Sequence, residues 1–187
     1  MRKGVLRLVF SAWILSGAIV AVAETKAPVI PDIEVIDQDG GVHRLYSDLI
    51  KGKTVALTFL YTSCKTSCPA MTGLFGAVQK KLQAESRRPV SLLSISIDPV
   101  TDRPAQLKTV ANRFGAGPGW YFLTGAYPDV ARVLAALNAA GPQLSDHPSM
   151  ILVGNDVTGH WTRHYGLASV PMVIDLIESV AGPGADR

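Results

Sequence analysis

Two cysteines, Cys64 and Cys68, are the only cysteines in this chain of 187 residues, and three residues separate them. If the segment turns into the first winding of a helix, their side chains fall at positions i and i+4 and point the same way. The amides at a helix N-terminus favour thiolate over thiol, and Pro69 suits the first helical position, where no amide donor is needed. Two such sulfurs can bind one metal ion together or form a disulfide with each other.

The donor set around the cysteines indicates which metal they would bind. Two thiolates are soft ligands that suit Cu(I), and an added imidazole makes a three-coordinate site that can also hold Cu(II), whereas zinc prefers a fourth protein ligand. Among His43, His147, His160 and His164, only His147 lies in a loop, residues 144–148, that enters a predicted central strand from the side facing the cysteines. We therefore expect one copper ion per chain on Cys64, Cys68 and His147, and we assign no metal role to His160 or His164.

The same two sulfurs allow other chemistry, which the spacing alone leaves open. As a redox pair, Cys64 would attack a disulfide of a partner protein and Cys68 would resolve the mixed disulfide, and such a thiol-disulfide reductase would work without metal. A structural disulfide is a third interpretation. It is disfavoured because the pair closes so small a loop and because the chain is long enough to bury a core without cross-links.

Two aspartates further along the chain are candidate supporting residues. Asp98 either orients His147, since metal-bound imidazoles usually donate their second nitrogen to an oxygen, or serves as a turn residue before Pro99. Asp102 is most simply the N-cap of a helix that begins at Pro104.

The N-terminus indicates an export signal. Three basic residues within positions 2–7 precede an apolar run over residues 8–22, and Ala21-Val22-Ala23 supplies the small residues that a signal peptidase recognises. We expect cleavage after Ala23 and a periplasmic protein, although an uncleaved anchor facing the periplasm would look much the same. Residues 24–187 are then expected to form one copper-binding domain.

Removal of the leader changes the charge of the chain. The full sequence carries 18 Lys and Arg against 15 Asp and Glu, and the three excess basic residues lie in the leader. The formal charge of residues 24–187 is therefore zero, and no segment clusters Lys and Arg with aromatic residues as a nucleic-acid surface requires. We expect no DNA or RNA partner, and membrane association only if the leader is retained.

The hydrophobic pattern predicts an α/β domain around a central mixed β-sheet. Residues 33–36 and 42–45 alternate as strands of an N-terminal hairpin, and residues 54–61 form a continuous apolar strand that runs directly into the cysteine motif. A helix over 69–85 follows the motif. The remaining predicted elements are strands 90–97, 120–123, 149–153 and 160–164, helices 104–114 and 128–140, and a C-terminal helix of about ten residues near 169–171. This is the order of a thioredoxin-like fold, with helices flanking the sheet.

Several segments resemble the Sco/SenC family of copper chaperones, over nearly all of the chain after the leader. They are FLYTSCKTSCP at 59–69, SISIDPVTDRP at 94–104, the following helix through 113–115, GWYFLTG at 119–125, and Asp146-His147. The resemblance implies a thioredoxin-like domain that binds copper through Cys64, Cys68 and His147 and delivers it to the binuclear copper centre of cytochrome c oxidase. It implies an oxidase subunit as acceptor and a chaperone rather than an enzyme. A thiol reductant protein is expected as second partner, because the cysteine pair must be reduced before it binds copper. Family members are also similar to thiol-disulfide reductases.

Two segments depart from the family pattern. His147 is followed by Pro148 where many relatives continue with serine, which puts a proline where oxidoreductases of this fold carry a cis-proline. Residues 154–161 replace a commoner Asp-Pro-x-Gly turn. The first departure favours the reductase alternative, and the second is compatible with a target other than the oxidase.

Overall fold

The computed structural model describes residues 27–85, 89–141 and 143–182. The predicted leader, residues 1–23, lies outside this described part. Within the part that is described, no helix combines the length and the apolar character needed to cross a membrane.

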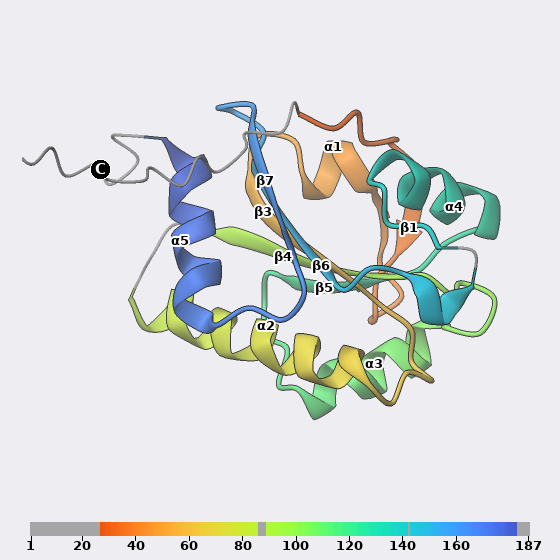
Figure 1. Ribbon diagram of the computed structural model, residues 1–187. Coiled ribbons are helices and arrows are strands. Elements are labelled where there is room, and N and C mark those ends of the chain that lie inside the picture. The colour runs from red at the N-terminus through yellow and green to blue at the C-terminus, as the bar shows by residue number, and fades with distance from the viewer. Residues whose placement is uncertain (1–26, 86–88, 142, 183–187) are drawn as a thin grey trace, which may run out of the picture.

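A five-stranded mixed sheet forms the centre of the molecule (Figure 1), as the hydrophobic pattern predicts. Its strand order is β5-β4-β3-β6-β7. The first three of these strands are parallel, and the last two run antiparallel to their neighbours. The bounds are β3 Thr54–Leu60, β4 Val90–Ser96, β5 Trp120–Leu123, β6 Met150–Asn155 and β7 His160–Tyr165. Every residue of β3 is buried, which explains its unbroken apolar sequence.

Helices cover both faces of the sheet, and each face has its own apolar core. One core packs α2 (Ser67–Ala84), α3 (Pro104–Arg113) and α5 (Val170–Ala181) against the sheet, and it includes both cysteines. The other core packs α1 (Leu45–Leu49) and α4 (Tyr127–Ala136) on the opposite face. The predicted hairpin is present as β1 (Glu34–Ile36) and β2 (Val42–Arg44), which pair antiparallel.

The hairpin also covers part of one edge of the central sheet. The amide of Ile36 donates to the carbonyl of Thr124 at 2.8 Å, and the amide of Thr124 donates to the carbonyl of Ile36 at 2.9 Å. These bonds join β1 to the chain that leaves β5, the outermost strand on that side. The opposite edge is β7.

The differences from the predicted elements lie at helix ends and in short helices. The predicted helix 128–140 ends at Ala136, because Asn138 adopts a positive φ of 52° that a right-handed helix cannot continue through. The helix after the cysteine motif begins at Ser67, two residues earlier than predicted, so Cys68 lies in its first turn. The five-residue α1 and the 3-10 helix η1 (Leu144–Asp146) are too short to produce a periodic signal in the sequence.

Candidate functional site

The cysteines lie where the chain leaves β3 and enters α2. After Leu60, the carbonyl of Tyr61 accepts a hydrogen bond from the amide of Cys64 at 3.1 Å, which forms a turn. The helix that follows directs the amide of Cys68 at the sulfur of Cys64, 3.4 Å away. Both thiols are free and buried. The predicted juxtaposition of the two sulfurs at a helix N-terminus is therefore present.

The two thiols differ strongly in acidity. Burial acts to raise the pKa of Cys64, but hydrogen bonds from the thiol and amide of Cys68, and then from Thr66, outweigh it and lower this pKa to about 7. Burial, followed by the interaction with Cys64, raises the pKa of Cys68 to about 12. Near neutral pH, Cys64 is thus the sulfur that ionises, while Cys68 keeps its proton and donates it in a hydrogen bond.

His147 directly follows η1 and packs against Tyr61. Its Nδ1 lies 2.8 Å from the carbonyl oxygen of Leu144. Since a carbonyl can only accept, Nδ1 carries the proton in this arrangement and Nε2 keeps a free lone pair. The imidazole also meets the ring of Tyr61 edge to face, with 5.7 Å between ring centroids and an interplanar angle of 80°. The side chain is half-buried and has the tautomer that a metal ligand at Nε2 requires.

Tyr61 is the side chain that contacts both parts of the site. Burial, and after it a hydrogen bond with Cys64, raises the pKa of the Tyr61 hydroxyl. Its ring is the one against which His147 packs. The sequence gives one signal for this role, an aromatic residue directly between the buried strand and the cysteine turn, and our sequence reasoning did not use it.

The three predicted ligands do not form a closed metal site in this conformation. Across residues 27–85, 89–141 and 143–182, no group of three or more His, Cys, Asp or Glu is close enough to hold a metal ion. The two cysteine side chains are hydrogen-bonded to each other, whereas His147 packs against Tyr61, which in turn bonds Cys64. The peptide bond before Pro148 is trans, as are all those described, so Pro148 is not the cis-proline of the oxidoreductases.

The other histidines lie elsewhere. His43 belongs to the hairpin, where its Nε2 is 2.8 Å from Asp37 and its ring packs edge-on against Tyr121. His160 and His164 are on the edge strand β7.

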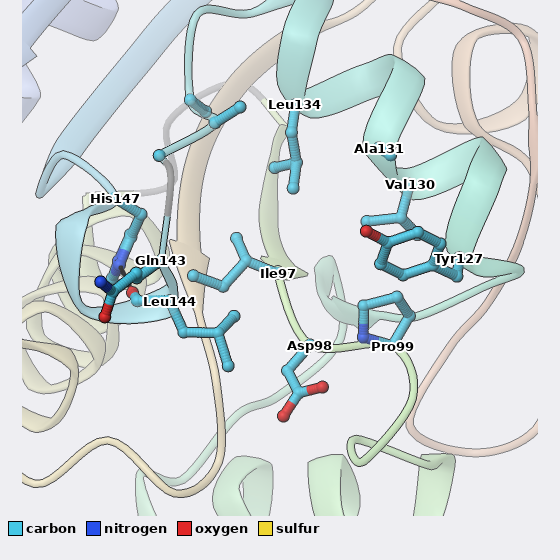
Figure 2. A pocket seen from close by; sticks show the side chains of 13 residues that line it. Ile97, Asp98, Pro99, Tyr127, Val130, Ala131, Leu134, Gln143, Leu144 and His147 are labelled. Carbon is cyan, nitrogen blue, oxygen red and sulfur yellow. Dashed lines mark hydrogen bonds between the residues drawn. The ribbon is translucent and has the colours of Figure 1, made fainter.

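Asp98 lies in a turn and has no bond to His147. Its backbone carbonyl accepts the amides of Thr101 and Asp102 at 3.1 and 2.8 Å, and its carboxylate accepts the Thr101 amide at 3.3 Å. Asp98 and His147 both line a cavity of about 320 Å³ beside α4, but Figure 2 shows the carboxylate and the imidazole on different sides of it. The turn interpretation therefore describes Asp98 in this structure.

The prediction that Asp102 caps helix α3 is wrong. The N-cap is Arg103, and no side chain makes a capping bond there. The Asp102 carboxylate turns inward instead, where it accepts hydrogen bonds from Thr62 and Ser96. An aspartate two residues before Pro104 has the sequence of a helix start, and only the packing of two distant loops shows that its side chain is used elsewhere.

The fold and the cysteine pair together define a thioredoxin-like protein with a dithiol at the start of its first long helix. The sequence matches the SCO1/SenC family model over residues 22–162, which is more than half of the chain, and the protein therefore belongs to the SCO1/SenC family. The Sco/SenC resemblance of the motifs is confirmed.

Individual proteins agree with this assignment. The SCO1 protein homolog of Bacillus subtilis is 41% identical over 106 residues, which cover 54% of this chain and 53% of that protein, so the match spans about half the length of this relative. The structure of a SCO1/SenC family lipoprotein from Bacillus anthracis is similar with a TM-score of 0.72 and 22% identity, covering 83% of this chain and 96% of that one.

Two further similar structures are those of the Sco proteins BsSco and ScoI. BsSco, described as having a disulfide switch and as a member of the Sco family of cytochrome c oxidase assembly proteins, has a TM-score of 0.67 and 29% identity, covering 84% of this chain and 97% of its own. Arabidopsis thaliana ScoI, solved with copper bound, has a TM-score of 0.65 and 20% identity, covering 79% of this chain and 95% of its own. These similarities confirm the thioredoxin-like α/β fold.

Proposed function

We propose that this protein is a copper metallochaperone that carries one ion on Cys64, Cys68 and His147. The observation that carries the proposal is the pair of free, buried sulfurs in contact at the start of α2, one of which ionises near neutral pH. Two adjacent soft donors suit Cu(I), and the imidazole extends the site to Cu(II). The copper-bound ScoI of Arabidopsis thaliana, a protein with the same fold, supports the choice of metal.

The proposed site closes when the η1 segment brings His147 to the sulfurs. The hydrogen bond from Nδ1 to Leu144 can persist during this movement, because Nε2 is the nitrogen left for the metal. Tyr61 contacts both the imidazole and Cys64, so its side chain must adjust when they come together. Copper is the cargo here, so a ligand that joins last is also suited to leave first when the ion passes to an acceptor.

We propose that the acceptor is an exported cupro-enzyme, most simply the binuclear copper centre of cytochrome c oxidase. The description of BsSco as a member of a family of oxidase assembly proteins supports this target. The predicted leader, and the lipoprotein of Bacillus anthracis, support an exported location for the chain, which we place in the periplasm. A thiol reductant protein is then needed, because the pair must be reduced before it can bind copper.

A thiol-disulfide reductase is the second candidate, and the unequal acidity of the two thiols favours it. In that reaction, the Cys64 thiolate attacks one sulfur of a partner disulfide, and the other partner sulfur leaves as a thiolate. Cys68 then loses its proton and attacks Cys64, which releases the second partner sulfur and leaves the Cys64–Cys68 disulfide. The partner gains two electrons and this protein loses two.

Copper titration of the reduced protein tests the chaperone proposal. With Cu(I) and a competing chelator, we expect one tight site per chain. The variant His147→Ala should bind Cu(II) much more weakly and Cu(I) only somewhat more weakly, because two thiolates alone still hold the softer ion. His160→Ala is the matched control and should behave as the wild type. Normal folding without competition for copper would contradict the proposal, and loss of the Cu(II)-thiolate absorption in His160→Ala alone would contradict the ligand assignment.

A test in cells separates the two candidates. Both cysteine variants, Cys64→Ser and Cys68→Ser, should abolish either function. A chaperone requires His147→Ala to behave like them, with low activity of the copper-dependent target that added copper partly restores. Full target activity in His147→Ala, with failure of both cysteine variants, would identify the protein as a reductase.

A further inference from the structure

A buried carboxylate connects the cysteine turn to the neighbouring strand. Asp102 has 0% of its surface exposed. Its two oxygens each accept the amide of Thr62 at 3.1 Å, and they accept the hydroxyls of Thr62 at 2.5 Å and of Ser96 at 2.6 Å. Thr62 is two residues before Cys64, and Asp102 lies 40 positions further along the chain than Thr62. The carboxylate thus joins the loop that follows β3 to the loop that follows β4.

Hydrogen bonds from neutral donors are what stabilise this carboxylate. Among the ion pairs of the described residues, none involves Asp102. A buried carboxylate is costly unless its oxygens are well bonded, so its donors must stay in place. The amide of Asp102 is itself fixed to the carbonyl of Asp98 at 2.8 Å, which makes the carboxylate a fixed point for Thr62.

The cysteine turn has few other bonds that hold its start. Backbone pairing between β3 and β4 ends with the amide of Ile97, which donates to the carbonyl of Leu60 at 2.9 Å. Beyond that point, the Cys64 amide bonds the Tyr61 carbonyl, and the contact between Cys64 and the Cys68 amide closes the turn. The direction in which the chain enters this turn is therefore set at Thr62.

We propose that Asp102 is a positioning residue for the dithiol: by fixing Thr62, it holds the sulfur of Cys64 in line with the amide of Cys68. Asp102 has no hydrogen bond to either sulfur, and it acts through the backbone of the turn. As a role in copper binding, this inference rests on the proposed function. As a role in placing Cys64, it stands for either candidate function.

The experiment measures which cysteine is alkylated in the reduced, metal-free protein. Iodoacetamide is added in limiting amount near neutral pH, and mass spectrometry gives the ratio of Cys64 to Cys68 modification. The variants are Asp102→Asn, which loses the charge and one acceptor, and Thr62→Val, which loses one hydroxyl donor. Thr62→Ser retains that donor. The matched control is Asp37→Asn, because Asp37 is also a buried carboxylate that accepts the backbone amides of a turn, but in the hairpin.

We expect Asp102→Asn to lower the Cys64 to Cys68 ratio by about tenfold. The reason is that a displaced Cys64 thiolate loses the hydrogen bond from the Cys68 amide, and a bond to a charged group has about this effect. Thr62→Val should lower it by about threefold or more, and Thr62→Ser should restore the wild-type ratio. Asp37→Asn should lose stability but keep the ratio. The Cu(I) affinity of the same variants should fall in the same order.

Two results would overturn the positioning role. One is a wild-type ratio in both Asp102→Asn and Thr62→Val, and the other is an equal loss in Asp37→Asn. If Asp102→Asn does not fold, Thr62→Val and Thr62→Ser decide the question. Because alkylation needs no copper, a shifted ratio in a protein that fails to bind copper rejects the chaperone proposal alone. Unshifted ratios with tight copper binding reject the role of Asp102 alone.

Discussion

The acidity of Cys64 can be tested by removing its nearest hydrogen-bond donor. Its ordinary pKa is 9.0 and its pKa in this site is about 7, a difference that corresponds to about 3 kcal/mol in favour of the thiolate. Against the opposing effect of burial, the thiol of Cys68 is the foremost contribution to this lowering, ahead of the backbone amides. The variant Cys68→Ala removes that thiol and keeps the Cys68 backbone amide that donates to the sulfur.

The expected effect follows from one lost hydrogen bond to a charged group. Such a bond stabilises the thiolate enough to move the pKa of Cys64 to about 8 in Cys68→Ala. At pH 7, the thiolate fraction would then fall from about a half to about a tenth. A thiolate of higher pKa is also more nucleophilic, by about threefold for this change, so the rate plateau at high pH should rise. The net rate at pH 7 should fall about twofold.

The assay is the alkylation rate of Cys64 between pH 5 and about 10, measured under pseudo-first-order conditions. The wild-type rate should rise through a midpoint near pH 7, because ionisation creates the nucleophile. The Cys68→Ala curve should start lower, cross the wild-type curve between about pH 7 and 8, and end higher. If Cys68→Ala only improved the access of the reagent to Cys64, the alkylation rate would rise by the same factor at every pH, and the two curves would not cross. A wild-type midpoint near 9.0, or the same midpoint in both proteins, would refute the reasoning.

Two glycine substitutions test close packing. In Gly154→Ala, the new methyl group would lie 2.2 Å from the buried ring of Trp161. We therefore expect the free energy of unfolding, measured with urea, to fall by about 1–3 kcal/mol. Unchanged stability would contradict this packing. In Gly141→Ala, the methyl group would lie 2.7 Å from the carbonyl carbon of Asp146 and must displace the peptide that leads to His147. If His147 is a ligand, Cu(II) affinity should change by more than Cu(I) affinity, and equal changes would argue against that role.

The fold could be predicted because its signals are local. The apolar run of β3, the helical spacing after Pro69 and the hairpin residues each depend on neighbours in sequence, and all three elements are present. The predicted elements differ from the structure where a single backbone conformation ends a helix, as the positive φ of Asn138 does after α4. They also differ where an element such as α1 is too short to show periodicity.

The site could be predicted only in part. The contact between Cys64 and Cys68 follows from their spacing and from the helix that begins beside them. The bond between Thr62 and Asp102 joins loops that follow two different strands, and no local pattern encodes it. The contacts of Tyr61 with both Cys64 and His147 likewise depend on how η1 packs, which only the three-dimensional structure reveals.

The bonds between Ile36 and Thr124 protect part of one edge of the central sheet. An outermost strand presents unpaired amides and carbonyls on which another chain can align and begin to aggregate. On the β5 side, the chain covers part of this row with its own hairpin, and Lys108 of α3 forms an ion pair with Asp39 in the hairpin turn. A shortened chain that began after Ile36 would keep all three proposed copper ligands but would leave β5 uncovered. The residues that protect this edge are thus separate from those proposed to bind copper.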